Sequence, residues 1–124
     1  MSHKGKQMIA MQVIAGPDEA AKLDRLFASH AAFMAETHHR DGDLALLSYN
    51  IAKSPEFVDP LAPEPVPTGN TIFLMVEIYE TAEGVADHWR LGTQVWKDFG
   101  VMMECMSKCK MTILHGSSVL HSLW

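Results

Sequence analysis

The sequence predicts an α+β fold with the element order β-α-β-β-α-α-β. Apart from an interruption in the second helical region, this is the βαββαβ order of a ferredoxin-like fold with a four-stranded antiparallel sheet. Two observations support this order: apolar runs rich in β-branched residues at 8–15 and 72–79, and a long amphipathic helix between the first two strands. At 124 residues we expect one domain, 1–124, with a flexible N-terminus at 1–7 and a Pro-rich loop at 54–70.

Composition excludes several classes of function. The chain has a formal net charge of −5, whereas nucleic-acid binding usually requires a basic face. No apolar run approaches the roughly 18 residues of a membrane span, and the N-terminus lacks the apolar segment of a signal peptide. We therefore expect a cytoplasmic protein without nucleic-acid or membrane partners.

Residues 8–15 read as a first buried strand, and a helix follows to about residue 39. Gly16-Pro17-Asp18-Glu19 is a typical helix start, because proline suits the first turn and acidic residues favour the helix dipole. The apolar stripe of this helix is Leu23, Leu26, Phe27, His30, Phe33 and Met34. His30 therefore faces inward, whereas we expect His38-His39 to form a solvated helix end.

A second strand is expected at 44–53, after the turn at Asp41-Gly42-Asp43. The next segment, 54–70, contains five prolines. Proline removes a ladder donor and fixes φ, so this segment is expected to be an extended surface loop.

The third strand, 72–79, and the helix at 82–91 carry the main candidate site. Thr81 can cap this helix, and Glu83 suits its first turn. Two residues break the apolar pattern: Glu77 in the middle of the strand and His88 on the helix. A strand-turn-helix unit can fold the helix back over the strand, so we expect His88 to lie within reach of Glu77.

Gly92 is expected to end that helix and Thr93 to cap a third one, running to about Ser107. The apolar stripe of the third helix is Val95, Trp96, Phe99, Met102, Met103 and Met106. Residues 110–120 form the last predicted strand. Cys105 and Cys109 are expected to be reduced thiols.

Two segments resemble a known family. Glu77-x-Tyr79, followed by a helix with His88 eleven residues after the glutamate, resembles the signature of the antibiotic biosynthesis monooxygenase (ABM) superfamily. The stretch from Gly42 to Tyr49 resembles the lead-in to that motif, so the likeness covers roughly residues 8–121. The chain departs from the pattern in its long Pro-rich segment. It also departs after His88, where many members carry a second histidine and a phenylalanine.

The resemblance implies a dimeric α/β barrel and a monooxygenase activity. ABM relatives include monooxygenases that oxidise phenolic aromatic substrates to quinones with dioxygen and without flavin, haem or metal. Such chemistry requires an electron-rich substrate, a base of near-neutral pKa and a dry apolar cavity. The expected partners are therefore a small phenolic, quinol or anthrone-like substrate and dioxygen, with no cofactor.

The residues suggest specific roles in that chemistry. His88, oriented by Glu77, is the first candidate base, and His30 is the second. Charge attraction by Glu77 and burial oppose each other, and together they are expected to leave the His88 pKa near neutral. The expected substrate-binding residues are Tyr79, Trp89, Trp96, Phe27, Phe33, Phe99 and Met103. No metal site is expected, because the sequence has no ligand cluster at chelating spacing.

Two other functions use the same fold. The chain could be a non-catalytic small-molecule binder in which the pocket holds a ligand or is filled core. It could also be a haem-degrading relative, since Trp89 occupies the position of a tryptophan that distorts haem in that branch. The chain has Phe99 and Gly100 near where the axial histidine would fall, and Gln12 rather than asparagine in the first strand.

The first and third strands read as apolar on both faces, but the helices can cover only one face of the sheet. The other face must be buried against something, and a second copy of the sheet is the natural solution. The sequence therefore predicts a homodimer.

Overall fold

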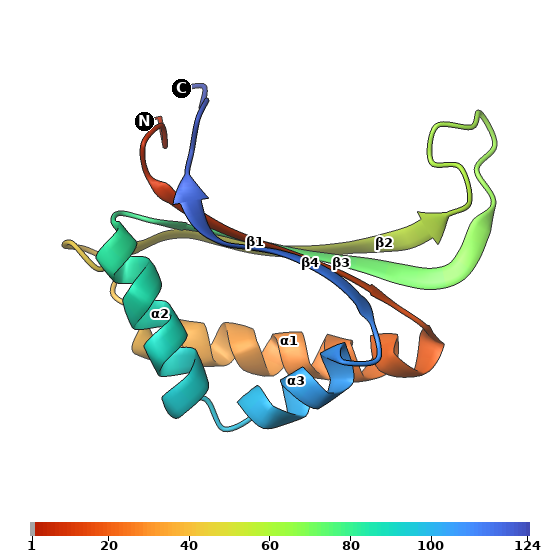
Figure 1. Cartoon of the computed structure of the whole chain (residues 1–124), viewed down its shortest axis with the longest axis horizontal. Coiled ribbons are helices and arrows are strands. Elements are labelled where there is room, and N and C mark those ends of the chain that lie inside the picture. The colour runs from red at the N-terminus through yellow and green to blue at the C-terminus, as the bar shows by residue number, and fades with distance from the viewer. Residues whose placement is uncertain (1) are drawn as a thin grey trace.

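The computed structural model of the protein describes residues 2–124. Four antiparallel strands form one sheet in the order β2-β3-β1-β4, and the helices lie on one of its faces (Figure 1). The elements are β1 (Gln7–Ala15), α1 (Pro17–Thr37), β2 (Leu46–Phe57), β3 (Pro67–Tyr79), α2 (Ala82–Gln94), α3 (Phe99–Met106) and β4 (Lys110–Ser118). The predicted ferredoxin-like fold is confirmed.

Side-chain alternation in the strands divides the sheet into two faces. In β1, Ile9, Met11 and Val13 point towards the helices and are buried. The residues between them, and their partners on the neighbouring strands, point to the face that no helix covers, called the open face below. On this face Leu74 of β3 and Leu114 of β4 are 44% and 48% exposed. Both faces of the central strands are thus apolar, as the sequence predicted.

The Pro-rich loop is shorter than the predicted range of 54–70. Strand β2 continues to Phe57 and β3 begins at Pro67, so only residues 58–66 form the connection. Pro55 is tolerated because β2 is an edge strand, and Pro67 is tolerated because it opens its strand. The hairpin is closed by Val58 N–H, which donates to the Val66 carbonyl over 2.9 Å.

The predicted break between the second and third helices is also misplaced. Helix α2 passes through Gly92 to Gln94, and α3 begins only at Phe99. Thr93 does not cap α3, since its hydroxyl donates back to the Trp89 carbonyl within α2, at 2.8 Å. The predicted cap at the start of α2 is confirmed, because Thr81 Oγ1 accepts from Gly84 N–H at 3.1 Å.

The N-terminal segment is hydrogen-bonded to the C-terminal segment. Gly5 N–H donates to the Val119 carbonyl at 3.0 Å, and Val119 N–H donates to the Lys6 carbonyl at 2.9 Å. His3 N–H donates to Ser122 Oγ at 2.9 Å. These hydrogen bonds join the N-terminal segment to the C-terminal segment, and the flexibility expected for residues 1–7 stays a prediction. Residue 1 of that expected segment lies outside the described part.

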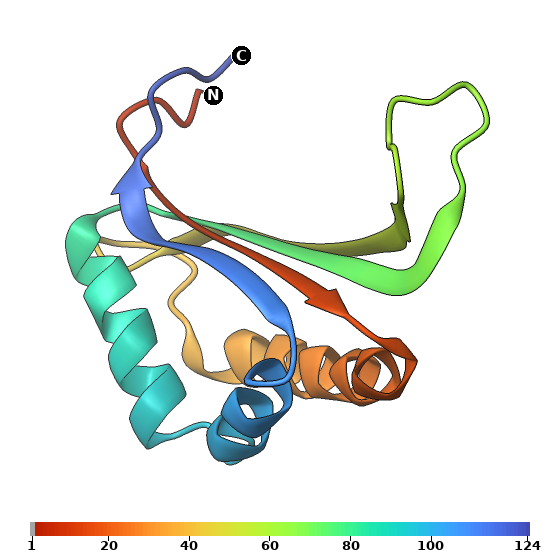
Figure 2. The ribbon, with the colours of Figure 1, turned by 45° about the vertical axis from the view of Figure 1, so that its right-hand side comes forward.

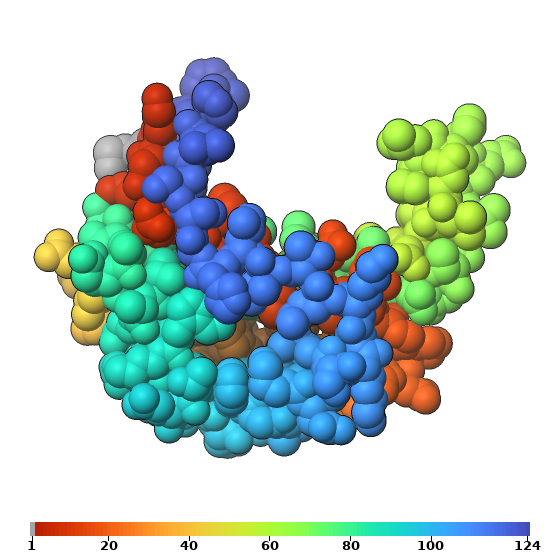
Figure 3. All heavy atoms as spheres, viewed as in Figure 1, coloured from red at the N-terminus to blue at the C-terminus, as the bar shows by residue number. Residues whose placement is uncertain are grey.

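Two projections rise from the open side of the sheet. Figure 2 shows the paired chain ends on one side and the β2–β3 connection on the other, both directed away from the helices. The space-filling view shows a hollow between them, above the sheet (Figure 3). Across residues 2–124, no helix has both the length and the apolar character that crossing a membrane would require.

Candidate functional site

A cavity of about 310 Å³ lies between the helices and the helix-covered face of the sheet. Methionine is the most frequent residue in its wall, which includes Met11, Met75, Met102, Met103, Met106 and Met111. Its aromatic members are Trp89, Trp96 and Phe99, and its titratable members are His30, His88 and His115. A mostly apolar wall with a few polar groups is typical of a site for a small organic ligand.

His88 is placed on the cavity wall by α2. Its side chain is buried, and its Nδ1 lies 2.9 Å from His38 Nε2 and 3.6 Å from Glu77 Oε1. The predicted approach of His88 to Glu77 is therefore found. The closer contact, however, is to His38, which the sequence analysis placed at a solvated helix end. His38 is in fact buried, because it follows the last turn of α1 and turns under α2.

A chain of hydrogen bonds fixes the tautomer of His88. The Thr37 hydroxyl donates to the Phe33 carbonyl at 2.8 Å, so at its 3.0 Å contact with His38 it accepts from Nδ1–H. Neutral His38 then has its lone pair on Nε2 and accepts from His88 Nδ1–H. We therefore assign the lone pair of His88 to Nε2, the nitrogen left for a molecule in the cavity.

His30 is held in a comparable way from α1. Its Nδ1 lies 2.7 Å from the hydroxyl of Tyr49, and its ring meets Trp96 edge-on at 5.0 Å between centroids. The Tyr49 O–H has no other acceptor among the described residues, so it donates to His30 Nδ1. His30 then carries its proton on Nε2. The cavity is thus flanked by one histidine acceptor and one histidine donor.

Glu77 lies behind the two histidines, two residues before the C-terminal end of β3, and is fully buried. Its Oε1 accepts from the Tyr79 hydroxyl at 2.5 Å. Its Oε2 is the only buried side-chain nitrogen or oxygen in residues 2–124 without a hydrogen-bond partner. Burial raises the pKa of this carboxyl to about 7, although the Tyr79 hydrogen bond opposes the shift.

The low pKa values of His30 and His88 make both side chains neutral at physiological pH. Burial, reinforced by His38 and His30, lowers the pKa of His88 to about 3, and burial with His38 lowers the pKa of His30 to about 4. The expectation of a near-neutral pKa for His88 is therefore wrong. The 3.6 Å separation from Glu77 would suit an ion pair, but burial pushes both groups towards their uncharged forms.

The predicted substrate-binding residues divide into two groups. Trp89, Trp96, Phe99 and Met103 line the cavity as predicted. Three predicted residues do not line it: Tyr79, Phe27 and Phe33. Tyr79 is occupied by Glu77, Phe27 stacks on Phe73 at 5.4 Å in the core, and Phe33 stacks on Trp96 at 6.1 Å. These aromatic rings support the wall from behind.

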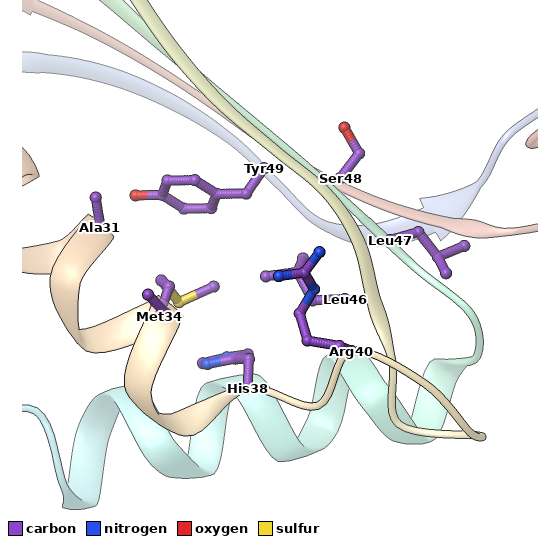
Figure 4. A pocket seen from close by; sticks show the side chains of 9 residues that line it. Ala31, Met34, His38, Arg40, Leu46, Leu47, Ser48 and Tyr49 are labelled. Carbon is purple, nitrogen blue, oxygen red and sulfur yellow. The ribbon is translucent and has the colours of Figure 1, made fainter.

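Sequence reasoning missed His38 and Tyr49. Both line a second pocket of about 260 Å³ on the outer side of the site, together with Met34, Arg40 and Leu46 (Figure 4). His38 and Tyr49 therefore separate the buried pair, His30 and His88, from this outer pocket. Tyr49 lies opposite Glu77 in the register of β2 and β3, a pairing that only the folded sheet shows.

One ligand-type atom from each of His30, Glu77 and His88 lies within 4.8 Å of the others, so these residues could hold a metal ion. Local spacing along the chain did not predict this cluster. The three residues come from α1, β3 and α2, and only the packing of these elements brings them together.

Two solved structures share this fold. A dimeric ferredoxin-like protein from an uncultured marine organism aligns with a TM-score of 0.58 and 12% identity, covering 95% of this chain and 99% of that one. A protein from Deinococcus radiodurans, provisionally assigned as an antibiotic biosynthesis monooxygenase, aligns with a TM-score of 0.54 and 16% identity, covering 95% and 99%. These identities show a shared fold alone. The sequence matches no protein-family profile and no curated protein.

Proposed function

We propose that this protein is a monooxygenase that oxidises an electron-rich phenolic, quinol or anthrone-like ring with dioxygen, without a cofactor. The observation that carries the proposal is a neutral His88 whose Nε2 lone pair is available to an apolar, aromatic-lined cavity. A small aromatic ring suits this space, and a general base is the one group that such a reaction requires of the protein. The resemblance of the Glu77–Tyr79–His88 segment to ABM proteins supports the same chemistry.

In the proposed reaction, His88 Nε2 removes a proton from the bound ring, and His30 Nε2–H donates a hydrogen bond to its oxygen. The resulting anion is electron-rich enough to reduce dioxygen. For an anthrone-like ring, one oxygen atom becomes the new carbonyl and the other leaves as water with the two ring hydrogens. The ring itself supplies the electrons.

The groups behind the histidines have defined parts in this proposal. His38 holds His88 in the tautomer with a free Nε2. When His88 takes up a proton it becomes an imidazolium, and Glu77 lies 3.6 Å from its Nδ1. The ionised carboxylate stabilises that positive charge. Trp89, Trp96 and Phe99 hold the ring, and the methionine wall excludes water and adapts to its shape.

We propose further that the protein works as a homodimer in which two sheets pack face to face. The open face of the sheet is apolar, and the chain ends and the β2–β3 connection rise on either side of it (Figures 2 and 3). A similar protein is itself a dimeric ferredoxin-like protein.

The test is oxygen uptake by the purified, EDTA-treated protein with a panel of hydroquinones, naphthols and anthrones. We expect at least one substrate to be consumed with matching uptake of dioxygen and formation of a quinone. If ligands quench the fluorescence of Trp89 and Trp96 but no oxygen is consumed, the protein is a non-catalytic binder. That result would overturn the proposal.

A further inference from the structure

We propose that His30, Glu77 and His88 bind one divalent first-row transition-metal ion. One ligand-type atom from each lies within 4.8 Å of the others. The ion-pair contact between His88 and Glu77 joins Nδ1 and Oε1, at 3.6 Å, so rotations of both side chains are needed to bring the free Nε2 and Oε2 to the roughly 2.0–2.2 Å of a shared ion. Two imidazoles and one carboxylate are a ligand set that such ions favour.

Each histidine has one nitrogen engaged and one free. His88 Nδ1 is held by His38 at 2.9 Å, and His30 Nδ1 is held by Tyr49 at 2.7 Å. Histidine ligands of metals nearly always show this arrangement, in which the second nitrogen is oriented by an outer partner. For His30 to offer a lone pair on Nε2, its proton moves to Nδ1 and is donated to the Tyr49 oxygen. The hydroxyl can accept it, because it acts as either donor or acceptor.

Glu77 likewise has one oxygen that is hydrogen-bonded and one that is free. Tyr79 donates to Oε1 at 2.5 Å, whereas Oε2 is buried and has no partner. A fully buried carboxylate without a Lys or Arg partner is costly as an anion. The one nitrogen base within ion-pair distance of it in residues 2–124 is His88. A dication placed among these three side chains would neutralise the carboxylate and use its free oxygen.

The site also has room for further ligands. His30 and His88 both line the 310 Å³ cavity, and its other lining side chains include no carboxylate, lysine or arginine. Three protein ligands beside an open space leave positions for water or a small molecule. The arrangement is thus that of an exchangeable metal site rather than a closed structural one.

The metal ion would compete with the proposed base. Coordination by His88 Nε2 occupies the lone pair that removes the proton from the substrate. We therefore infer that metal binding inhibits the cofactor-free oxidation. The existence of the metal site does not depend on the proposed function, and only this inhibition rests on it.

The test is a titration of the EDTA-treated, full-length protein with Co²⁺, followed through the visible d–d absorption of the bound ion. We expect one ion per chain, displaced by Zn²⁺. Loss of a residue that only orients a metal ligand typically lowers affinity by roughly 10–100-fold. Glu77→Gln, His30→Ala and His88→Ala each remove a ligand, so each should weaken Co²⁺ binding by at least this factor. The matched control is His39→Ala, which removes an exposed histidine next to the site and should bind Co²⁺ as the wild type does.

Circular dichroism checks that each variant is folded. If a ligand variant fails to fold, His38→Gln keeps all three ligands and should still weaken Co²⁺ binding by roughly 10–100-fold. The inference is overturned if the wild type gives no d–d band at about 100 µM Co²⁺, or if Glu77→Gln and His38→Gln bind as tightly as the wild type.

Oxygen uptake separates this inference from the proposed function. Cobalt binding without any oxidation by the metal-free protein would refute the proposed function alone. Oxidation without cobalt binding would refute the metal site alone. If both occur, added Zn²⁺ should suppress oxygen uptake in proportion to site occupancy.

Discussion

At the scale of single residues, the tautomer of His88 is set by the side chains that contact it in the fold, not by its neighbours in sequence. Its Nδ1 is held by His38, whose own Nδ1 is held by Thr37. This order leaves His88 Nε2 without a proton. A buried histidine that stays neutral at pH 7 can accept a proton but is a weak base in the resting protein. In the proposed reaction the positive charge develops on His88, and the ionised form of Glu77, 3.6 Å from its Nδ1, stabilises that charge.

Replacing His88 with Ala should reduce turnover of an active quinol-type substrate by roughly 10²–10⁴-fold, the loss typical of a general base. Glu77→Gln should cost less, because the side chain keeps its shape and loses its charge. Initial rates of oxygen uptake measure both, with His39→Ala as the control. If His88→Ala is fully active and His30→Ala is inactive, His30 is the base. Full activity in both variants would show that neither histidine is the base.

The same residues predict how stability depends on pH. The pKa values of His88 and His30 are lowered from 6.5 to about 3 and about 4, so the unfolded chain binds more protons below pH 6.5 and stability falls on acidification. Glu77 acts in the opposite sense. Its pKa is raised from 4.5 to about 7, so its contribution is present at low pH and is lost as the pH rises through 7.

Glu77→Gln removes this opposing contribution. Between pH 7 and pH 5, the free energy of unfolding should therefore fall more steeply in Glu77→Gln than in the wild type, by about 1–3 kcal/mol. Urea unfolding of EDTA-treated protein at the two pH values measures this difference. Equal slopes would mean that Glu77 is ionised over the whole range.

At the scale of elements, α2 sets the position of His88 relative to β3. The helix starts at Thr81, whose hydroxyl accepts from Gly84 N–H and donates to the Asp43 carbonyl. Gly84 packs closely on the chain before β2, where an added Cβ would lie 3.2 Å from the Leu44 carbonyl oxygen. The start of α2 is therefore fixed to the chain before β2 and to Tyr79 at the end of β3, and His88 follows one turn after Gly84.

Thr81→Ala should destabilise the protein by about 0.5–2 kcal/mol, the usual cost of losing an N-cap. The matched control is Thr93→Ala near the other end of α2, where the hydroxyl bonds only within its own helix. This control should change stability little, since alanine is the better helix former. Thermal or urea unfolding of the two variants makes the comparison. An equal effect at both positions would contradict the capping role.

At the scale of the whole molecule, the helices form one layer that covers one face of the sheet and leaves the other face uncovered. The helices bury one face around the histidine cavity, and the opposite face presents apolar side chains between two projections (Figure 3). Single copies of this chain would expose that face to water. Exposed apolar areas of this kind usually mark an interface.

Light scattering at micromolar concentration should therefore give twice the 13.8 kDa mass of one chain. Leu74→Glu places a charge on the open face and should shift the protein towards the monomer. Val101→Glu is the control, because Val101 is 59% exposed on α3 and lies on the helical side. A wild-type mass of 13.8 kDa would refute the dimer.

The sequence by itself determined the order of the elements, the two apolar faces of the central strands and the approach of His88 to Glu77. These features follow from local periodicity, because the spacing of apolar residues fixes which face of a strand or helix is buried. A carboxylate in an apolar strand and a histidine on the next helix are close in sequence as well as in space. The Thr81 cap is also a local feature, and it too was predicted.

Only the tertiary structure decided the roles of His38, Tyr49 and the cavity wall. His38 follows a helix end, where periodicity carries no information about burial, and it meets His88 only because α1 and α2 lie on the same face of the sheet. The six methionines come from three strands and α3, so their convergence depends on how the layers pack. The pKa of His88 depends on the same packing, since burial together with His38 and His30 outweighs the attraction of Asp87.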